Sequence, residues 1–525
     1  MIRSKKIMGA FLIVLLALVL TACSTTRSSS DSGGAASSDK KDKDINIAVN
    51  QDFTTLDPHN VSDTLSISAT HAIYEGLVGF DKDMKIQPVL ATDYKISDDG
   101  LTYTFHLRKN VKFQDGSSFN AEAVKANFDR IQSSKDALIA SHYLQYLKSV
   151  KIVDDHTIQL ILNQPFSAML NKLTMVEMIS PKALKDQGDK IGMHPVGTGP
   201  FEFVKWNQGE SLILKKNPNY WDKGYPKVDQ ITYKSVPENG SRVDMLKTGE
   251  ADFIYPLPEQ SVQALKTQND ITVDQTTSNI VRYVTLNTNK KPFNDKKVRQ
   301  AMNYALDKNA YIKVVKSGFG SELDSTMAPS TQFYSKQKVY NYDLSKAKEL
   351  MKEAGYAKGF TAEIWGDTDS ATMKGMQFIQ QQMARINIKL KIKAMEQGTL
   401  SDAINTPKSP DDAKVQMWYV SWSPSSGDAD GATRGLFSSA AFPPNGSNTA
   451  YYKNGEVDKL IDKANQTTDV EKQKSMYATI QKDIYNDAPW LFLGVDTNLS
   501  AHVNKLKGVY VLPDGSIQVK EAELQ

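Results

Sequence analysis

The chain has 525 residues but only one cysteine, Cys23, and this single thiol most constrains what the chain can fold into. An intramolecular disulfide, a thiolate metal site and a catalytic thiol are all excluded. The 481 residues that follow residue 44 (525 minus 44) are also too many for one hydrophobic core. Two or three domains are therefore expected.

The residues before Cys23 are typical of secretion. Three cations within the first six residues precede the uncharged, mostly apolar stretch from Met8 to Leu20, which has the pattern of a signal peptide. This stretch is shorter than the roughly 20 apolar residues that a bilayer span needs. Leu20-Thr21-Ala22-Cys23 resembles the lipobox of bacterial lipoproteins, in which cleavage leaves the cysteine at the new N-terminus. An ordinary signal peptide with an incidental cysteine is the alternative.

These features predict the location of the protein. Residues 1–22 are expected to be a lipoprotein signal peptide, and Cys23 is expected to carry the lipid, palmitate included, on its sulfur. Ser24 follows, so the sequence carries no aspartate signal for inner-membrane retention. We expect the protein to be lipid-anchored at the outer face of the cytoplasmic membrane, on the extracytoplasmic side.

Residues 23–44 are predicted to form a flexible tether. From Ser24 to Asp44 the chain is rich in Ser, Gly, Asp and Lys and has no apolar side chain larger than alanine. Such a segment cannot bury enough surface to offset its ordering entropy. As a flexible coil it would reach about 25 Å, at about 5–6 Å times the square root of its length.

The charge balance excludes one class of partner. The formal net charge is +3, and removing the three cations of the signal leaves it near zero. A basic surplus that would attract nucleic acid is absent, so no nucleic-acid partner is expected. No second long apolar run follows the signal, so we expect the mature part to be soluble.

Strand and helix patterns alternate after the tether. Leu101–Arg108 alternates apolar and polar residues, which predicts a half-buried strand. Helical periodicity occurs in Val298–Leu306, with Asp295 as N-cap, and in Leu344–Ala354, opened by Asp343. Interleaved elements of both kinds indicate an α/β or α+β protein.

Catalytic motifs are missing from the sequence. It contains no P-loop, no H-E-x-x-H and no G-x-S-x-G, and its seven histidines are scattered. Asp98-Asp99-Gly100 and Asp154-Asp155 are interpreted as turns between strands. We therefore expect no catalytic residue, no cofactor and no metal site. A pair of carboxylates distant in sequence could still serve hydrolysis, and this alternative stays open.

A series of short segments extends over more than 400 residues in a characteristic order. They are Asn46–Val49, Thr55–Pro58, Ile73–Leu77, Leu90–Val124, Gly197–Pro200, Asn217–Trp221, Thr248–Asp252, Asn287–Lys308 and Asp343–Tyr356. In this order they resemble the extracellular solute-binding proteins of the peptide, nickel and glutathione ABC importers. The resemblance covers essentially the whole mature chain.

Within that family the chain is most similar to the glutathione-binding branch. The similarity is local, in Asn50–Pro58, Asn163–Ala168, Arg282-Tyr283, Tyr419–Ser423 and Glu521–Gln525. Members of one branch can differ in ligand through a few pocket residues, so the branch does not fix the ligand.

The resemblance implies an α/β, periplasmic-binding-protein-like fold with two lobes (a Venus flytrap) and an extra third domain. The lobes would close on a ligand in the cleft, and the importer would recognise the closed form. Two crossing segments are expected near Ser278–Leu286 and Leu491–Ser500. The predicted parts are lobe I (45–77, 198–283 and 499–525), the extra domain (78–197) and lobe II (284–498).

The first crossing segment and the end of the first strand supply ligand-binding candidates. Arg282 is a permanent cation suited to bidentate binding of a carboxylate, although a surface arginine is the alternative. Tyr283 is a second candidate that could equally pack in the core. The resemblance also makes Thr54 and Thr55 candidate hydroxyl contacts, whereas Asp57 is better explained as a turn residue before Pro58.

Aromatic residues form a second candidate wall. Trp418 and Trp422 lie in a strand-like segment, and their rings can bury area against a ligand while their N–H groups donate to it. We favour Trp422 for the site, whereas core packing is equally consistent with Trp418. Trp365 precedes a polar turn that contains Asp369, and the resemblance implies ligand-facing groups in this segment too.

The chain departs from the oligopeptide and dipeptide branches at Ser425. In those branches an aspartate three residues after the tryptophan pairs with the α-amine of the ligand, and here that position is Ser425. A serine cannot neutralise an ammonium, and a buried unpaired charge costs several kcal/mol. A γ-glutamyl peptide carries its amine and carboxylate on one carbon and would need another arrangement, which agrees with the branch resemblance.

These features predict a small peptide-like ligand, with glutathione suspected, and the permease of an ABC importer as partners. We expect a monomer with no enzymatic activity, held at the membrane through Cys23. A general di- or oligopeptide, or a nickel chelate, is the alternative ligand in the same class. A secreted hydrolase or an envelope chaperone on the same scaffold is the alternative from another class.

Overall fold

The computed structural model describes residues 43–134, 138–338, 340–424 and 426–525. The predicted signal peptide, Cys23, the predicted tether as far as residue 42 and Ser425 lie outside the described residues. The predicted end of the tether at Asp44 is wrong, because Asp44 is the first residue of strand β1 (Asp44–Val49). None of the helices in the described ranges has the length and hydropathy needed to cross a bilayer.

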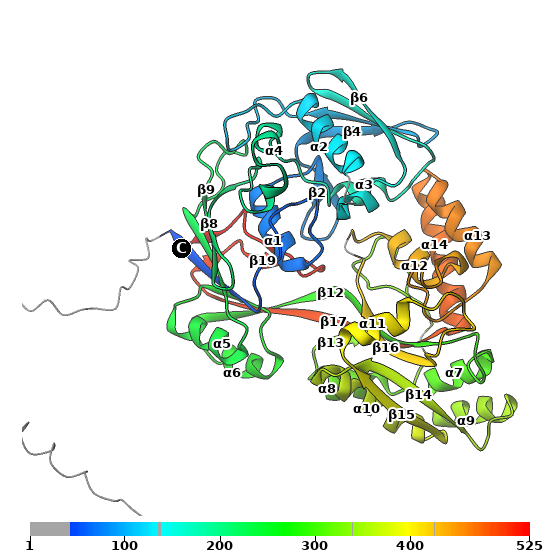
Figure 1. Ribbon diagram of the computed structural model, residues 1–525. Coiled ribbons are helices and arrows are strands. Elements are labelled where there is room, and N and C mark those ends of the chain that lie inside the picture. Colours follow the sequence, from blue (N-terminus) through cyan, green and yellow to red (C-terminus); the bar gives the residue numbers. More distant parts are fainter. Residues whose placement is uncertain (1–42, 135–137, 339, 425) are drawn as a thin grey trace, which may run out of the picture. The chain divides into compact units, whose positions relative to one another are not determined.

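The predicted α/β fold is confirmed, and its main element is one mixed sheet (Figure 1). The strand order is β15-β14-β16-β12-β17-β11-β1-β10-β9-β8, and β13 pairs with β17 beside this path. The strands of this sheet are β1 (Asp44–Val49), β8 (Phe201–Asn207), β9 (Ser211–Lys216), β10 (Gln230–Ser235), β11 (Phe253–Tyr255), β12 (Ile271–Leu286), β13 (Gly320–Glu322), β14 (Phe360–Asp367), β15 (Ile388–Met395), β16 (Met417–Trp422) and β17 (Trp490–Val503).

Two long antiparallel strands, β12 and β17, connect the two halves of this sheet, and Figure 1 shows them crossing the middle of the fold together. Lobe I contributes β11, β1, β10, β9 and β8, and lobe II contributes β16, β14 and β15. The pairing shifts between Thr277, opposite Thr497, and Val281, opposite Val495. Three residues of β12 therefore bulge opposite a single residue of β17 where the lobes meet.

Lobe I is completed by helices and short hairpins around its half of the sheet. Its buried cluster combines early residues such as Ile47 with late ones such as Val511. Ile179, Ala183 and Ile191 also pack in this core, although they lie within the predicted extra domain. The elements are α1 (Thr64–Ile73), α4 (Pro181–Gln187), α5 (Asn239–Thr248), α6 (Val262–Lys266), β18 (Leu506–Lys507), β19 (Tyr510–Val511), β20 (Ile517–Gln518) and β21 (Glu523–Leu524).

The extra domain has a core of its own around a four-stranded antiparallel sheet of order β4-β5-β7-β6. The predicted alternation holds in β5, and the two acidic pairs form the β4–β5 and β6–β7 turns. The elements are β2 (Val78–Phe80), β3 (Ile86–Pro88), β4 (Ala91–Ile96), β5 (Thr102–Leu107), β6 (Leu147–Asp154), β7 (Thr157–Leu162), α2 (Ala121–Ser133) and α3 (Met169–Leu173).

Lobe II carries helices on both faces of its half-sheet, and buried clusters lie on both faces. The predicted caps are confirmed: Asp295 accepts from the Lys297 N–H and Asp343 from the Lys346 N–H. The helices are α7 (Lys296–Tyr304), α8 (Lys308–Val315), α9 (Leu344–Glu353), α10 (Ser370–Ala384), α11 (Gln397–Asn405), α12 (Ala429–Phe437), α13 (Gly455–Gln466) and α14 (Val470–Asp487).

A glycine-rich loop passes directly against the end of α1. A Cβ atom on Gly197 would lie 2.2 Å from the carbonyl oxygen of Ile73, and one on Gly199 would lie 2.6 Å from its carbonyl carbon. Only glycine allows this approach, so the loop signal in the sequence marks close backbone packing.

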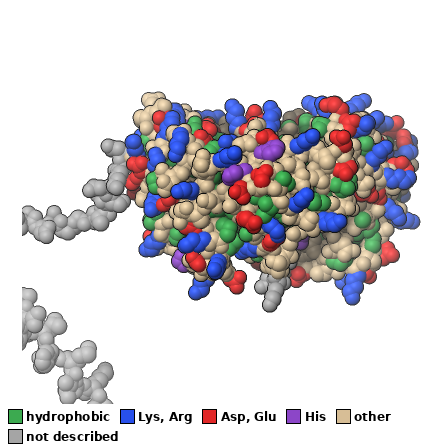
Figure 2. Space-filling view, turned by 90° about the horizontal axis from the view of Figure 1, so that it is seen from above, with side chains coloured by type: hydrophobic (Ala, Val, Ile, Leu, Met, Phe, Trp, Pro, Cys, Tyr) green, Lys and Arg blue, Asp and Glu red, His purple; other side chains and the backbone are tan. Residues whose placement is uncertain are grey.

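Charges of both signs are mixed on the surface. On the face shown in Figure 2, Lys and Arg side chains are interspersed with those of Asp and Glu. This face therefore has no dominant positive patch.

Candidate functional site

The strand directions locate the candidate site. β14, β15 and β16 are parallel to one another, and β16 is antiparallel to β12. β11 runs in the same direction as β12 because both are antiparallel to β17. The carboxyl ends of the parallel strands of each half-sheet therefore point toward the other half. Ligands of open α/β sheets bind outside such carboxyl ends.

Arg282 lies in β12 at this junction and is held by the other crossing strand. Its Nε donates to both carboxylate oxygens of Asp496 in β17, at 3.0 and 2.8 Å. Lys316 forms a second ion pair with Asp496, with its Nζ 3.1 Å from Oδ1. The Nη1 and Nη2 groups of Arg282 make no hydrogen bond to any residue that the structure describes, and 26% of the side chain is exposed.

The electrostatics keep Arg282 charged. Burial lowers its pKa, but the carboxylate of Asp496 together with Tyr419 and Tyr311 raises it by more, and the result lies above the ordinary value. Arg282 is thus a permanent cation that is oriented through Nε, with two outer nitrogens that no described residue binds.

Asp369 supplies a negative charge near Arg282. It is the N-cap of α10, where its Oδ1 accepts from the N–H groups of Ala371 and Thr372, both at 2.9 Å. Burial raises the pKa of Asp369, whereas the hydrogen bonds of Thr372 and Ala371 and the charge of Arg282 lower it, and the net shift is downward. Asp369 is exposed, so its carboxylate is accessible from solvent, and the side chain of Thr372 also contributes a hydrogen bond to it.

Tyr419 belongs to the same surroundings, and sequence reasoning did not single it out for the site. Its hydroxyl lies 2.6 Å from that of Tyr311 in α8, and burial raises its pKa while Arg282 lowers it. The ring fits because α10 carries Gly375 there, where a Cβ would lie 2.4 Å from Tyr419 Cζ. Strand alternation was the signal that could have found it. Tyr419 pairs with Val284, which is two residues along β12 from Arg282, so Tyr419 and Arg282 lie on the same face of the sheet.

The two tryptophan candidates in β16 lie on the other face of the sheet. Trp422 pairs with Val281 and Trp418 with Thr285, both an odd number of residues from Arg282. Both tryptophans are half-buried, and the Nε1 of Trp422 has no hydrogen-bond partner in the described part of the chain. A ligand that contacts both Arg282 and Trp422 must therefore pass around the carboxyl end of β16, from one face of the sheet to the other.

Tyr283 and Trp365 are buried inside lobe II, each with 3% of its surface exposed. Tyr283 stacks on Trp490 with ring centroids 3.5 Å apart and planes 8° from parallel. The Nε1 of Trp365 donates to Glu363 at 3.2 Å, and the ammonium of Lys393 lies 4.2 Å from its ring centroid. In this structure neither side chain offers a surface to a ligand, because core neighbours already cover it.

Thr54 and Thr55 lie after β1, as expected, but their hydroxyls are engaged within lobe I. The Oγ1 of Thr54 donates to Asp63 at 2.5 Å, and that of Thr55 accepts from the Asp57 N–H at 3.1 Å. Thr54 is exposed, so its role as a ligand contact stays a prediction, as does that of Ser425. No group of three or more His, Cys, Asp and Glu side chains with the arrangement of a metal site occurs among the residues that the structure describes.

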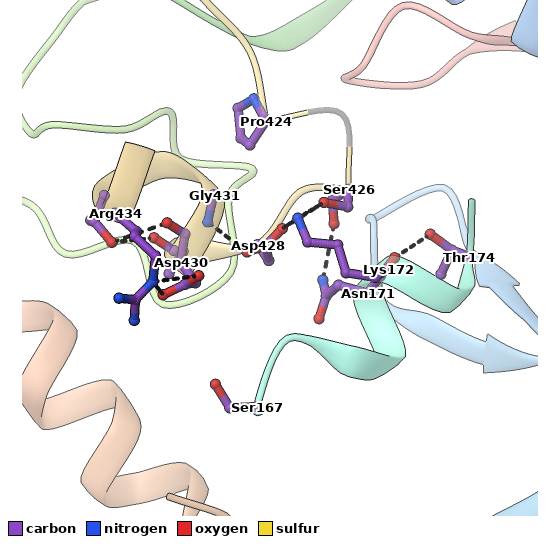
Figure 3. A network of polar contacts seen from close by, with 12 residues as sticks. Ser167, Asn171, Lys172, Thr174, Pro424, Ser426, Asp428, Asp430, Gly431 and Arg434 are labelled. Carbon is purple, nitrogen blue, oxygen red and sulfur yellow. Dashed lines mark hydrogen bonds and ion pairs between the residues drawn. The ribbon is translucent and has the colours of Figure 1, made fainter. Parts of the chain in front are cut away.

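The residues that follow β16 connect three parts of the molecule. Ser423 and Pro424 bond to Asn279 in the bulge of β12, and Ser426 and Asp428 bond to α3 of the extra domain. Figure 3 shows the second of these contacts, in which Lys172 reaches Ser426 and Asp428. The wall that ends at Trp422 is therefore attached to both the crossing strands and the extra domain.

Comparison with known proteins gives one family and several close relatives. Residues 85–444 match the family model of the bacterial extracellular solute-binding proteins, family 5 (middle region). The chain is 42% identical over 485 residues to a glutathione-binding protein, GsiB, of Pectobacterium atrosepticum, covering 92% of this chain and 94% of that protein.

Two solved structures share the fold. HbpA2 from Haemophilus parasuis superposes with a TM-score of 0.82 at 25% identity, over 92% of this chain and all of that chain. The periplasmic binding protein DppA from Helicobacter pylori, in complex with the peptide STSA, superposes with a TM-score of 0.73 at 31% identity, over 91% and 98% of the two chains.

Proposed function

Because this chain belongs to the bacterial extracellular solute-binding proteins of family 5, we propose that it captures glutathione or a related small peptide and delivers it to the permease of an ABC importer. The similarity to a protein named for glutathione binding supports this ligand class. The family assigns binding and not catalysis, and we propose no enzymatic activity.

The nearness of two opposite charges, the Arg282 cation and the exposed Asp369 carboxylate whose pKa it lowers, is the observation that carries the ligand proposal. Arg282 is a cation whose two outer nitrogens bond to no residue that the structure describes, and Asp369 is an exposed carboxylate. A γ-glutamyl group presents an α-carboxylate and an α-ammonium on one carbon. The Nη1 and Nη2 of Arg282 would bind the carboxylate in a bidentate manner, and the exposed carboxylate of Asp369 would accept from the ammonium.

An ordinary peptide satisfies this pair less well. The α-ammonium at its N-terminus stands next to a peptide carbonyl, so Arg282 would receive no carboxylate beside the ammonium that Asp369 binds. An unmatched charge that is partly desolvated by the ligand loses hydration without compensation. The arrangement therefore favours a ligand whose end resembles a free amino acid.

The comparison of solved structures supports an open arrangement of the lobes. The peptide complex of DppA superposes less well than HbpA2, although its sequence identity is higher. Rotation of two intact lobes lowers a superposition of the whole chain without changing either lobe, as hinge closure around a ligand would do.

We also propose the location that the N-terminal sequence predicts. Cys23 would carry the lipid, and the residues up to 42 would tether the binding domain to the outer face of the cytoplasmic membrane. A monomer remains our expectation.

The test is calorimetric titration of the chain from Ser24 onward after unfolding and refolding, which removes any ligand carried through purification. The titrants are reduced glutathione, oxidised glutathione, γ-Glu-Cys and Ala-Ala-Ala. We expect 1:1 binding of a γ-glutamyl compound and none of Ala-Ala-Ala. Arg282→Ala should raise the Kd by about thirtyfold, equivalent to about 2 kcal/mol for a charge-assisted pair.

Two control variants sharpen this titration. Arg282→Lys keeps the charge but loses the planar fork, so it should recover only part of the affinity. Arg385→Ala removes a lobe II arginine that bonds to the exposed Tyr342, and it should bind like the unmodified chain. Binding of Ala-Ala-Ala alone would contradict the γ-glutamyl proposal and favour a general peptide-binding protein.

A further inference from the structure

The residues that follow β16 are attached at both ends, and the first attachment is to the crossing strands. The Oγ of Ser423 donates to Asn279 Oδ1 at 2.6 Å, and Asn279 Nδ2 donates to the carbonyl of Pro424 at 3.2 Å. Asn279 lies in the bulge of β12, is 1% exposed and donates its own N–H to Pro513 of lobe I at 2.9 Å. This attachment therefore lies where lobe I and lobe II meet.

The second attachment is to the extra domain (Figure 3). The Nζ of Lys172 in α3 donates to Ser426 Oγ and to Asp428 Oδ2, both at 2.7 Å. The side chain of Asn171 donates to the carbonyl of Ser426 at 3.1 Å. Since α3 belongs to the extra domain and Asp428 to lobe II, these bonds link two parts that are more than 250 residues apart in the sequence.

Burial makes this ion pair sensitive to the loss of one partner. The side chain of Asp428 is fully buried, and that of Lys172 is 15% exposed. Burial raises the pKa of Asp428, but Lys172, Ser426 and the Gly431 N–H lower it below its ordinary value. Removing Lys172 would leave a buried carboxylate without a cation, since the neighbouring Arg434 is bound to Asp430 and Asp462.

We propose that Lys172 is a positioning residue for the binding site: it fixes the residues after Trp422 to the extra domain and so sets the angle at which lobe II presents its wall. The ligand part of this proposal rests on the proposed function. The extra domain then takes part in binding without touching the ligand, because it restricts the lobe positions sampled before the ligand arrives. Preorganisation of this kind increases affinity by reducing the ordering cost of binding.

The experiment measures geometry and affinity separately on Lys172→Met. In the chain from Ser24 onward no native cysteine remains, so Val153→Cys and Val470→Cys provide the only two thiols for spin labels. Val153 lies in β6 of the extra domain and Val470 in α14 of lobe II, and their side chains are 51% and 58% exposed. Pulsed electron resonance then gives the distance distribution between these two parts without ligand. Calorimetry gives the Kd of reduced glutathione.

We expect Lys172→Met to broaden the distance distribution and to raise the Kd about tenfold, within the range of couplings transmitted through packed contacts. Lys172→Arg keeps the ion pair and should restore both values. Lys125→Met is the matched control, because Lys125 lies in α2 of the extra domain and pairs with Asp129 at the exposed surface. It should leave both values unchanged.

Each outcome decides the proposal, provided that circular dichroism shows the variant folded. An unchanged distance distribution in Lys172→Met overturns it, and so does a broadened distribution with an unchanged Kd. If the unmodified chain does not bind glutathione, the proposed ligand fails while the distance measurement still tests the attachment. Should Lys172→Met fail to fold, Lys172→Met combined with Asp428→Asn removes the unpaired charge and supports the same measurements.

Discussion

The extra domain meets lobe I and lobe II through contacts of different kinds. Its junction with lobe I, called here the lobe I junction, is formed by Asp57, His59 and Ile73 of lobe I with Gln114, Arg130 and Glu177 of the extra domain. Its junction with lobe II, called here the lobe II junction, is formed by Ser167, Asn171 and Lys172 with Ser426, Asp428 and Asn465. Only the first also contains the two chain passages that connect the domains covalently.

The lobe I junction is a continuous buried network. Arg130 donates to both carboxylate oxygens of Asp57, at 3.0 and 2.7 Å, and lies 2.8 Å from His59 Nδ1. The other ring nitrogen of His59, which is fully buried, lies 2.9 Å from the carbonyl of Glu177. The guanidinium of Arg130, the imidazole of His59 and main-chain groups thus bond to one another across the junction. Closure of the lobes would have to leave these bonds intact.

The lobe II junction is narrower, because the hydrogen bonds across it between described residues come from Ser167 and from α3 of the extra domain. Besides the Lys172 contacts, the Ser167 N–H donates to the Asn465 carbonyl at 2.8 Å. The difference between the junctions indicates that the extra domain moves as one body with lobe I and makes a separable contact with lobe II. The following changes test this difference, from the largest effect to the smallest.

Arg130→Met should have the largest effect. It removes the cation from Asp57, whose side chain is 12% exposed, and leaves a nearly buried carboxylate unpaired. The free energy of unfolding should fall by about 3 kcal/mol, at the lower end for a broken buried pair. Urea denaturation followed by circular dichroism measures this loss, and the folded variant should bind ligand with unchanged Kd.

The control for this change is an exposed pair of the extra domain. Lys125 bonds to Asp129 on the outer side of α2, with both side chains more than one-third exposed. Lys125→Met should change stability by less than about 0.5 kcal/mol. A loss for Arg130→Met no larger than this control would mean that the lobe I junction is not a fixed connection.

Lowering the pH should weaken the same junction through His59. Burial and the neighbouring Arg130 lower the pKa of His59 from 6.5 to about 4. Below pH 6.5 the unfolded chain therefore takes up a proton that the folded chain does not, so stability falls as the pH drops from 6.5 to 4. Between pH 7 and 5 this amounts to about 2 kcal/mol.

His59→Gln isolates that contribution from other titrating groups. Burial raises the pKa of Glu75 and of Glu177, so these carboxylates stabilise the fold as the pH falls and oppose His59. The difference in unfolding free energy between the unmodified chain and His59→Gln should therefore shrink by about 2 kcal/mol from pH 7 to pH 5. A constant difference would show that His59 is not held neutral in the junction.

Asn171→Ala tests the lobe II junction without removing a charge. The change removes one buried hydrogen bond to the Ser426 carbonyl and should cost about 1 kcal/mol of stability. In contrast to Arg130→Met, it should also broaden the distance distribution between residues 153 and 470. A stability loss as large as that of Arg130→Met, with an unchanged distribution, would make the two junctions equivalent.

Much of the fold was predictable because local patterns determine it. The alternation at Leu101–Leu107 and the caps Asp295 and Asp343 depend on neighbours within four residues, and each appears in the structure as predicted. The two lobes and the crossing strands were predicted from the family resemblance. The bulge at Ser278–Ile280 was not foreseen, because it depends on the register between two strands that are more than 200 residues apart.

The candidate site was less predictable for the same reason. Arg282 and Tyr283 were both proposed from one segment, but neighbouring strand residues point to opposite faces, and Trp490 covers the face of Tyr283. Tyr419 is placed by Gly375 on another element. The role of Lys172 depends on Asp428, which lies 256 residues away. Contacts of this kind follow from tertiary packing and have no local signal.

The smallest effect should appear in hydrogen exchange on addition of ligand. If the lobe II junction is coupled to the binding wall, glutathione should slow amide exchange in peptides that cover α3 and the start of α12. The change should be on the order of two- to tenfold, because these contacts already exist without ligand. Peptides that contain Asp57, Arg130 or Glu177 should exchange at the same rate with and without ligand. Equal slowing at both junctions would indicate a general stabilisation of the folded state by binding, in which case the two contacts of the extra domain would respond as one unit.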